Sequence, residues 1–200
     1  MCIRDRLILA MEREKETPNP APAIRYLMDP SPSMARDRPY VETFDWSPLR
    51  FMGTHVAPDY QDWKAQVRSL DPAETNYLLV ANYRKLPRDA DAPTPPGPKE
   101  VMGWTEEHSP VPVIGVNVFN VEDGGAIALG ASPFEQGEVA ADLAERILED
   151  GEQAKDLPML INRHYVVAIN QAALERRGLD LPQIYETFAR TTFTYIESAP

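Results

Sequence analysis

The chain has 200 residues, with 20 Lys and Arg against 31 Asp and Glu, so its formal net charge is −11. A chain this acidic is poorly suited to bind nucleic acids or anionic membranes, because its own field opposes both. Hydrophobic residues make up 43% and charged residues 26%, the composition of a folded globular protein with a packed core. A single cysteine excludes an internal disulfide, and the length fits one domain or two small ones.

The first 22 residues are rich in charge and then in proline. Their longest apolar run, Leu7 to Met11, is shorter than the core of a secretion signal and far shorter than a membrane span. Alternating acidic and basic residues over 12–16 are followed by three prolines, a pattern typical of an extended linker. We therefore predict that residues 1–22 are a disordered leader without a signal peptide, and that the fold occupies residues 23–200.

From Ile24 onward, short apolar runs alternate with amphipathic stretches, which predicts an α/β fold with a mostly parallel sheet flanked by helices. Strands are predicted over residues 24–28, 50–56, 77–81, 111–116, 126–130 and 165–169. Helices, with their caps, are predicted over residues 33–44, 59–70, 99–108, 132–151, 170–178 and 182–189. The almost wholly apolar run 77–81 is expected to be a central strand covered on both faces. Residues 86–98 contain five prolines and are predicted to form an exposed loop.

The helix after residue 132 has the clearest pattern. Ser132 is its predicted N-cap, and Gly151 stands where a C-terminal cap belongs. Its apolar stripe is formed by Ala140, Leu143, Ala144, Ile147 and Leu148. Such a stripe is typical of an amphipathic helix.

Motifs for catalysis and for metal binding are not found in the sequence. The histidines His55, His108 and His164 are isolated from one another and have no cysteine near them, so they form no metal-binding motif. There is no Gly-x-Ser-x-Gly elbow, no Gly-x-Gly-x-x-Gly turn and no Walker loop. The paired carboxylates lie in helical or capping contexts, where a solvated helix face explains them. We therefore predict no enzymatic activity, no metal and no cofactor.

Polar side chains gather instead at the predicted carboxyl ends of the strands. In open α/β sheets, ligands bind outside this edge, at strand ends and helix N-termini, so these residues predict one ligand site. Its members are Asp29, Ser31, Ser33, Asn82, Tyr83, Asn117, Asn120 and Ser132. Tyr83 is of special interest, because a flat ring with one hydroxyl is a usual wall of a small-molecule cleft. The alternative is that Asp29, Ser33 and Ser132 only cap helices and that the asparagines serve turns.

Several stretches of the chain, taken together, resemble one family. Those in the second half are Gly125-Ala126 to Gly137, Ala140-Ala141 to Ile147-Leu148, Gly151, Asp156-Leu157-Pro158, Val166 to Asn170, Ala173, Gly178-Leu179 and Leu181-Pro182. Those in the first half are Tyr26 to Asp29, Asn82-Tyr83-Arg84, Trp104 and Val111 to Gly115. In order and spacing, over about residues 24–190, they resemble the substrate-binding proteins of ABC transporters, in the group loosely associated with tryptophan and tyrosine binders.

This resemblance implies a type I periplasmic-binding fold, in which two Rossmann-like or flavodoxin-like lobes are joined by crossing hinge strands and close on a ligand between them. The chain is then expected to be the carboxyl-terminal lobe of a truncated protein. Its implied function is the solute-binding component of an ABC importer, which binds a small polar organic ligand and presents it to a membrane permease. The implied location is periplasmic or extracytoplasmic. Surface around residues 164–169 is expected to be exposed where the other lobe is missing.

Two other functions are compatible with the same pattern. The first is a ligand-sensing domain of a receptor or transcription regulator, which a fused kinase or helix-turn-helix segment would favour. The second is an enzyme on a flavodoxin-like sheet. Such an enzyme needs a phosphate-binding loop after the first strand, and residues 29–33 contain no glycine and begin with an aspartate.

Overall fold

The computed structural model describes residues 3–89, 91, 94–158, 160 and 163–197. Within these residues the chain forms one seven-stranded sheet of order β2-β1-β3-β4-β5-β6-β7. The strands are β1 (Ala23–Met28), β2 (Arg50–Val56), β3 (Tyr77–Val80), β4 (Val113–Gly115), β5 (Ile127–Ala131), β6 (Tyr165–Asn170) and β7 (Tyr195–Ile196). Neighbouring strands run parallel except β5 and β6, which are antiparallel. The predicted α/β fold with a mostly parallel sheet is confirmed.

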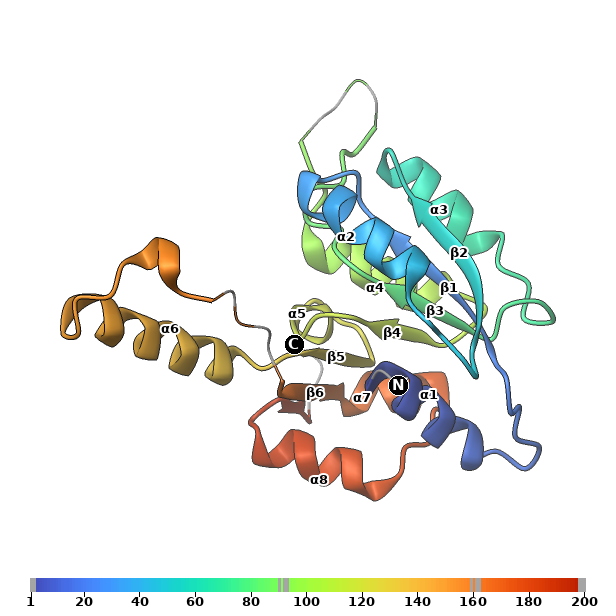
Figure 1. Ribbon diagram of the computed structural model, residues 1–200. Helices are drawn as coiled ribbons and strands as arrows, with labels where there is room; N and C mark the ends of the chain where they lie inside the picture. Colours follow the sequence, from blue (N-terminus) through green and yellow to red (C-terminus); the bar gives the residue numbers. More distant parts are fainter. Residues whose placement is uncertain (1–2, 90, 92–93, 159, 161–162, 198–200) are drawn as a thin grey trace.

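Helices cover both faces of this sheet (Figure 1). They are α1 (Ile3–Arg13), α2 (Pro32–Thr43), α3 (Tyr60–Arg68), α4 (Pro98–His108), α5 (Phe119–Glu122), α6 (Pro133–Leu148), α7 (Gln171–Arg177) and α8 (Gln183–Thr191), with a 3-10 turn at Ala154–Asp156. Buried side chains of α1, α2 and α8 pack on one face and those of α3 and α4 on the other. We call these the first core and the second core.

Strand β3 lies between the two cores. Tyr77 and Leu79 belong to the first core, whereas Leu78 and Val80 belong to the second. All four side chains are buried, because successive residues of a strand point to opposite faces and both faces are covered by helices. The prediction of a central strand at this position is confirmed.

Helix α1 corrects the prediction for residues 1–22. Leu7, Ile8 and Met11 are 0%, 0% and 3% exposed and belong to the first core. Glu12, on the last turn, accepts a hydrogen bond of 2.6 Å from the Tyr77 hydroxyl in the sheet. The exclusion of this segment from the fold is therefore wrong for residues 3–13. The apolar run was too short for a signal, but it is long enough to form the buried face of an amphipathic helix.

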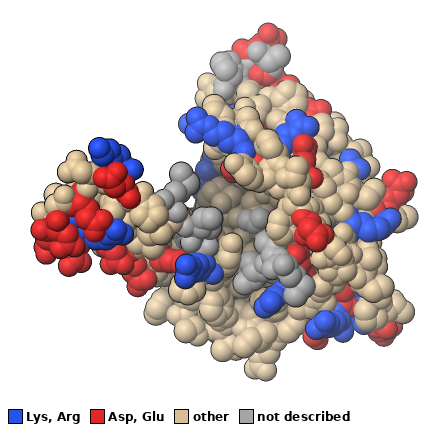
Figure 2. Space-filling model, viewed as in Figure 1, with Lys and Arg blue, Asp and Glu red and all other residues tan. Residues whose placement is uncertain are grey.

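Helix α6 begins and ends close to its predicted positions, but its surroundings were not foreseen. The Ser132 hydroxyl accepts a hydrogen bond of 3.3 Å from the Glu135 amide, so the predicted N-cap is confirmed. None of the 16 residues of this fully described helix is buried. Phe134 is 62% exposed and Leu148 is 81% exposed. Figure 1 shows why: α6 projects from the body at the left of the view, and acidic side chains gather on this projection in Figure 2.

Strand β6 differs from the expectation of an exposed surface around residues 164–169. Val166 and Ile169 are 3% and 0% exposed, because β6 pairs with β5 on one side and β7 on the other and is packed by α8. The proline-rich segment 86–98 lies partly outside the described residues. Its described part is only partly exposed up to the start of α4, because Leu86 is buried in the second core and Pro96 is buried as well.

Candidate functional site

The carboxyl ends of β1, β3 and β4 meet at one edge of the sheet, which we call the carboxyl edge. The Asp29 amide, just after β1, donates to the carbonyl of Asn82, just after β3, at 2.8 Å. The Val116 amide, just after β4, donates to the Val80 carbonyl at 3.0 Å. The segments that follow these three strands are therefore adjacent, as the sequence predicts.

Asp29 is fully buried and organises two of the segments at the carboxyl edge. One of its carboxylate oxygens accepts from the Ser31 amide at 3.1 Å, and the other accepts from the Lys85 amide at 3.0 Å. The Ser31 hydroxyl lies 3.1 Å from the hydroxyl of Ser33, which is exposed. Ser31, rather than Ser33, is the N-cap residue of α2, and its side chain makes no capping hydrogen bond. Asp29 holds the loops in place, while Ser33 is open to solvent.

Asn120 has a similar positioning role at the end of β4. It is fully buried, and its amide nitrogen donates to the carbonyls of Val80 and Ala81 at 3.3 and 3.4 Å. Its side-chain oxygen accepts from the Asn117 amide at 3.1 Å. A Cβ at Gly115 would lie 2.5 Å from the Asn120 Cβ, so this close approach needs a glycine. Asn117, by contrast, is only partly buried.

Tyr83 lies in the second core, which differs from the cleft wall that the sequence predicts. Its side chain is 0% exposed, and its ring makes edge contacts with the rings of Trp63 and Phe119, with centroids 6.0 Å away in each case. Its hydroxyl donates to Asp123 Oδ2 at 2.7 Å. Burial, together with this carboxylate, raises the pKa of Tyr83. Tyr83 therefore does not line a cleft. Of these two neighbouring residues after β3, Asn82 is partly exposed at the carboxyl edge, whereas the Tyr83 side chain is directed into the core.

Replacing Tyr83 by phenylalanine should lower the free energy of unfolding by about 1–2 kcal/mol, because Asp123 loses a buried hydrogen-bond donor while the packing of the ring is kept. Urea unfolding followed by circular dichroism measures this change. The matched control is Tyr40→Phe, since Tyr40 is 78% exposed, and its effect should stay within about 0.5 kcal/mol. Equal effects of the two substitutions would contradict the buried hydrogen bond.

Arg84 and Phe119 are the side chains at this edge that the sequence reasoning missed. The Arg84 guanidinium donates to Asp123 Oδ2 at 2.9 Å and lies 4.2 Å from the centroid of the Phe119 ring. The Arg84 side chain is 41% exposed, so a charged group faces solvent beside Asn82. Its place two residues after Asn82, beside the end of a predicted strand, is the sequence signal that could have located it.

Ser132 is placed differently from the other candidates. Its hydroxyl caps α6, and its amide donates to the His164 carbonyl at 3.0 Å, just before β6. Its capping role is the alternative that the sequence left open. The candidates that present partly or fully exposed side chains at the carboxyl edge are Ser33, Asn82 and Asn117.

Two further features of the described residues bear on function. No group of three or more His, Cys, Asp or Glu side chains that could hold a metal ion is present in the part of the chain that the structure describes. Over the same residues, no helix combines the length and the apolar character needed to cross a bilayer.

Comparison with known proteins finds a family model that matches part of the chain. Residues 100–191 match the model of a family described as "ABC transporter substrate binding protein". This segment begins in α4 and ends at the end of α8, so it includes the segments that carry Asn117, Asn120 and Ser132. A search among curated proteins found no match.

Solved structures share the fold over most of the chain. A conserved domain protein from Vibrio cholerae is 17% identical with a TM-score of 0.59, covering 88% of this chain and 54% of its own. An ABC domain from Streptococcus pneumonia, solved in complex with L-Trp, is 15% identical with a TM-score of 0.58, covering 96% of this chain and 60% of its own. A ligand-free, open substrate-binding protein with adhesive properties from Clostridium difficile is 18% identical with a TM-score of 0.59. The match covers 90% of this chain and 55% of that protein.

At these identities the structures establish the fold alone, and this chain spans between half and three fifths of their length. The resemblance that the sequence predicts is confirmed to this extent: residues 100–191 match the model of the ABC transporter substrate-binding protein family, and the α/β fold is shared with solved substrate-binding proteins.

Proposed function

We propose that the chain is one lobe of the solute-binding component of an ABC-type importer, and that its carboxyl edge forms one wall of a cleft for a small polar organic ligand. The observation that carries this proposal is the family match over residues 100–191, since that segment supplies the loop with Asn117 and Asn120. Ser33, Asn82 and Asn117 are the side chains proposed to contact the ligand. The buried Asp29 and Asn120 are proposed to hold their loops.

The exposed apolar face of α6 supports the assignment to one lobe of a larger assembly. Soluble proteins rarely leave a large contiguous apolar surface in contact with water. Phe134, Ala141 and Leu148 recur at intervals of seven residues on α6, so they lie on one side of the helix, and all three are exposed. The solved structures with this fold contain more chain than the part they share with it. A second lobe packed on α6 would remove this face from water.

In the proposed mechanism, the ligand first binds to one wall and then bridges to the other lobe. A ligand that binds the closed arrangement better than the open one shifts the population toward closure. The closed form would be recognised by a permease in the membrane, and the protein would act outside the cytoplasm, as its family does. No catalytic step is required of any residue.

The carboxyl edge also argues against an enzyme that binds phosphate there. A phosphate loop offers free backbone amides at the end of the first strand. Here the amides of Ser31 and Lys85 already donate to the Asp29 carboxylate, which would repel a second anion. No observation favours the sensing-domain alternative over transport.

The proposal is tested by calorimetric titration of the full chain, with L-tryptophan as the first probe and other amino acids, sugars and purines after it. Replacing Asn82 by alanine should weaken binding of the ligand by about 1–3 kcal/mol, since a polar contact in the cleft is lost. Gln61→Ala removes an exposed amide on α3 and should leave the affinity unchanged.

Unchanged affinity in the Asn82→Ala variant would show that the carboxyl edge is not the site. Failure of every probe to bind saturably would contradict a ligand-binding role for this lobe.

A further inference from the structure

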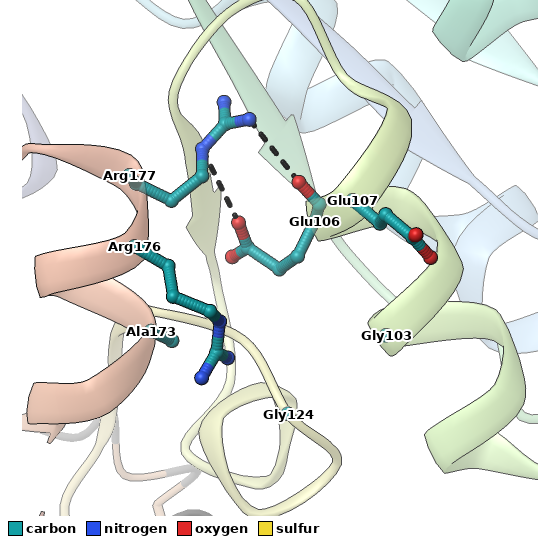
Figure 3. Close-up of a pocket in the computed structure, with 7 residues that line it drawn as sticks. All are labelled: Gly103, Glu106, Glu107, Gly124, Ala173, Arg176 and Arg177. Carbon is teal, nitrogen blue, oxygen red and sulfur yellow. Dashed lines mark hydrogen bonds and ion pairs between the residues drawn. The ribbon is translucent and has the colours of Figure 1, made fainter.

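A cavity of about 550 Å³ lies between α4, the turn before β5 and α7 (Figure 3). The residues that line it are Gly103, Glu106, Glu107, Gly124, Ala173, Arg176 and Arg177. The turn at residues 123–126 leads into the amino end of β5, and α4 ends before β4 begins. The lining includes neither Asn82 nor Asn117, so the cavity is distinct from the proposed cleft.

Glu106 is the buried acid of this cavity. Its side chain is 8% exposed, and Oε1 accepts a hydrogen bond of 2.8 Å from the amide of Ala126. Among the described residues Oε2 has no hydrogen-bond partner, and it lies 3.7 Å from Arg177 Nε. A buried carboxyl oxygen without a hydrogen bond is costly, and a group that donates to it or accepts from it would relieve that cost.

Arg177 has a structural role, because it joins two of the elements that form the walls of the cavity. Its guanidinium donates to the carbonyls of Glu106 and Ser109, at 3.1 and 2.8 Å, and also to that of Val111. These bonds tie α7 to the carboxyl end of α4, where helix carbonyls lack partners within the helix. Its Nε–H forms no such bond and is directed toward Glu106 in Figure 3.

Arg176, unlike Arg177, has no structural role that packing or hydrogen bonding accounts for. It is exposed, and within the described part of the chain its guanidinium forms no hydrogen bond or ion pair at contact distance. Figure 3 shows the guanidinium extending from α7 toward Gly124, below the Glu106 carboxyl, whereas the Glu107 side chain extends away from both arginines. The interior of the cavity therefore presents two guanidinium groups and one carboxyl group.

Two glycines keep this space open. A Cβ built at Gly103 would meet no atom within 4 Å, so this position borders free space rather than packed side chains. Gly124 has φ of +110°, which disfavours any other residue, and its Cβ would lie 3.9 Å from the Gly103 backbone. Larger side chains on either element would narrow the cavity between α4 and α7.

We propose that this cavity binds a small organic monocarboxylate, held by the guanidinium of Arg176 and by a hydrogen bond with the buried Oε2 of Glu106. Arginine recognises carboxylates through parallel N–H donors, and a neutral carboxylic acid supplies a further donor to an anion. An anion is favoured over a cation because the guanidinium of Arg176 and the Nε–H of Arg177 are on this side, whereas the Glu107 side chain extends away from both arginines.

The protonation of Glu106 makes this binding dependent on pH. Burial raises the pKa of Glu106 to about 7, against the opposing effects of the Ala126 amide and of Arg177 and Arg176. Of the other charged groups on the neighbouring elements, Glu107 points outward, and Asp123 is already paired with Tyr83 and Arg84. The carboxyl group is mostly neutral at pH 6 and mostly ionised at pH 8, where it repels an anion.

The test is a calorimetric titration of the full chain with benzoate, which is ionised at both pH values, at pH 6 and pH 8 and constant ionic strength. We expect saturable binding at pH 6 and an affinity about tenfold lower at pH 8, since the neutral fraction of Glu106 falls by that factor. Arg176→Gln should weaken binding at pH 6 about tenfold or more, because a charge-assisted pair is lost. Glu106→Gln should bind with an affinity that no longer changes with pH.

Arg36→Gln, which removes an exposed arginine from α2, is the matched control and should bind as the unmodified chain does. Since Arg176 is exposed, its replacement leaves the core intact, and thermal unfolding verifies this. No saturable binding of benzoate at pH 6 would overturn the proposal. Equal affinities of the Arg176→Gln and unmodified chains, or equal affinities at the two pH values, would overturn it as well. None of these results depends on ligand binding at the carboxyl edge.

Discussion

Replacing Leu7 by alanine is expected to lower the free energy of unfolding by about 2–5 kcal/mol, the largest effect of any change considered. Leu7 lies on α1 and is 0% exposed within the first core. Its loss removes apolar surface from the core and leaves a cavity that the surrounding side chains fill only partly. A disordered leader would give no such effect.

The matched control is Leu148→Ala, the same truncation at a leucine that is 81% exposed on α6. Its effect should stay within about 0.5 kcal/mol, because no buried contact is lost. Urea denaturation of both variants, with the slope of the transition compared between them, measures the difference. If Leu7→Ala were as mild as Leu148→Ala, the packing of α1 on the sheet would be contradicted.

Replacing Glu106 by glutamine should change how stability depends on pH. Burial raises the pKa of Glu106 to about 7 from its usual 4.5, so between these pH values the folded state holds a proton that the unfolded state has already lost. The stability from this group is complete below pH 4.5 and is lost as the pH rises to 7 and beyond. The difference between the two pKa values corresponds to a loss of about 3 kcal/mol from the free energy of unfolding as the pH rises past both of them.

The Glu106→Gln variant keeps an oxygen for the Ala126 amide but has no proton to release, so its stability should not show this fall. Urea unfolding at a series of pH values from 4 to 8 measures it. Glu107→Gln, on the same helix at a side chain that is 78% exposed, should keep the pH dependence of the unmodified chain. Parallel pH profiles for the Glu106→Gln and unmodified chains would show that Glu106 is ionised in the folded protein throughout this range.

The sequence predicted those elements whose pattern reflects burial on two faces. The apolar run at residues 77–81 could only be satisfied inside a sheet, and it is the central strand β3. The clustering of Asp29, Asn82 and Asn120 also followed from sequence, because parallel strands bring their carboxyl ends to one edge. What the sequence did not reveal is which of these polar side chains face outward.

The errors arose where a short segment has two physical explanations. A hydroxyl-bearing ring at Tyr83 suits a cleft wall, but it suits a core equally well once Asp123 accepts its hydrogen bond. The charged residues over 12–16 suggested a linker, yet Arg13 is exposed on a packed helix and Glu12 is buried at its hydrogen bond with Tyr77. Both choices depend on residues distant in the sequence, at Asp123 and at Tyr77, so local pattern alone does not decide them.

The projection of α6 has a mechanical consequence. The chain leaves the sheet at Ala131 and returns at Tyr165, and these two residues face each other in the β5–β6 ladder. The two backbones that join α6 to the sheet therefore start side by side at this pair, and a rotation of α6 against the sheet would change the backbone torsions there. A helix of 16 residues is about 24 Å long, so a turn of about 10° at this pair moves Leu148 by about 4 Å. Because the helix projects from this point, a small rotation at the Ala131–Tyr165 pair would produce a much larger displacement of its far end.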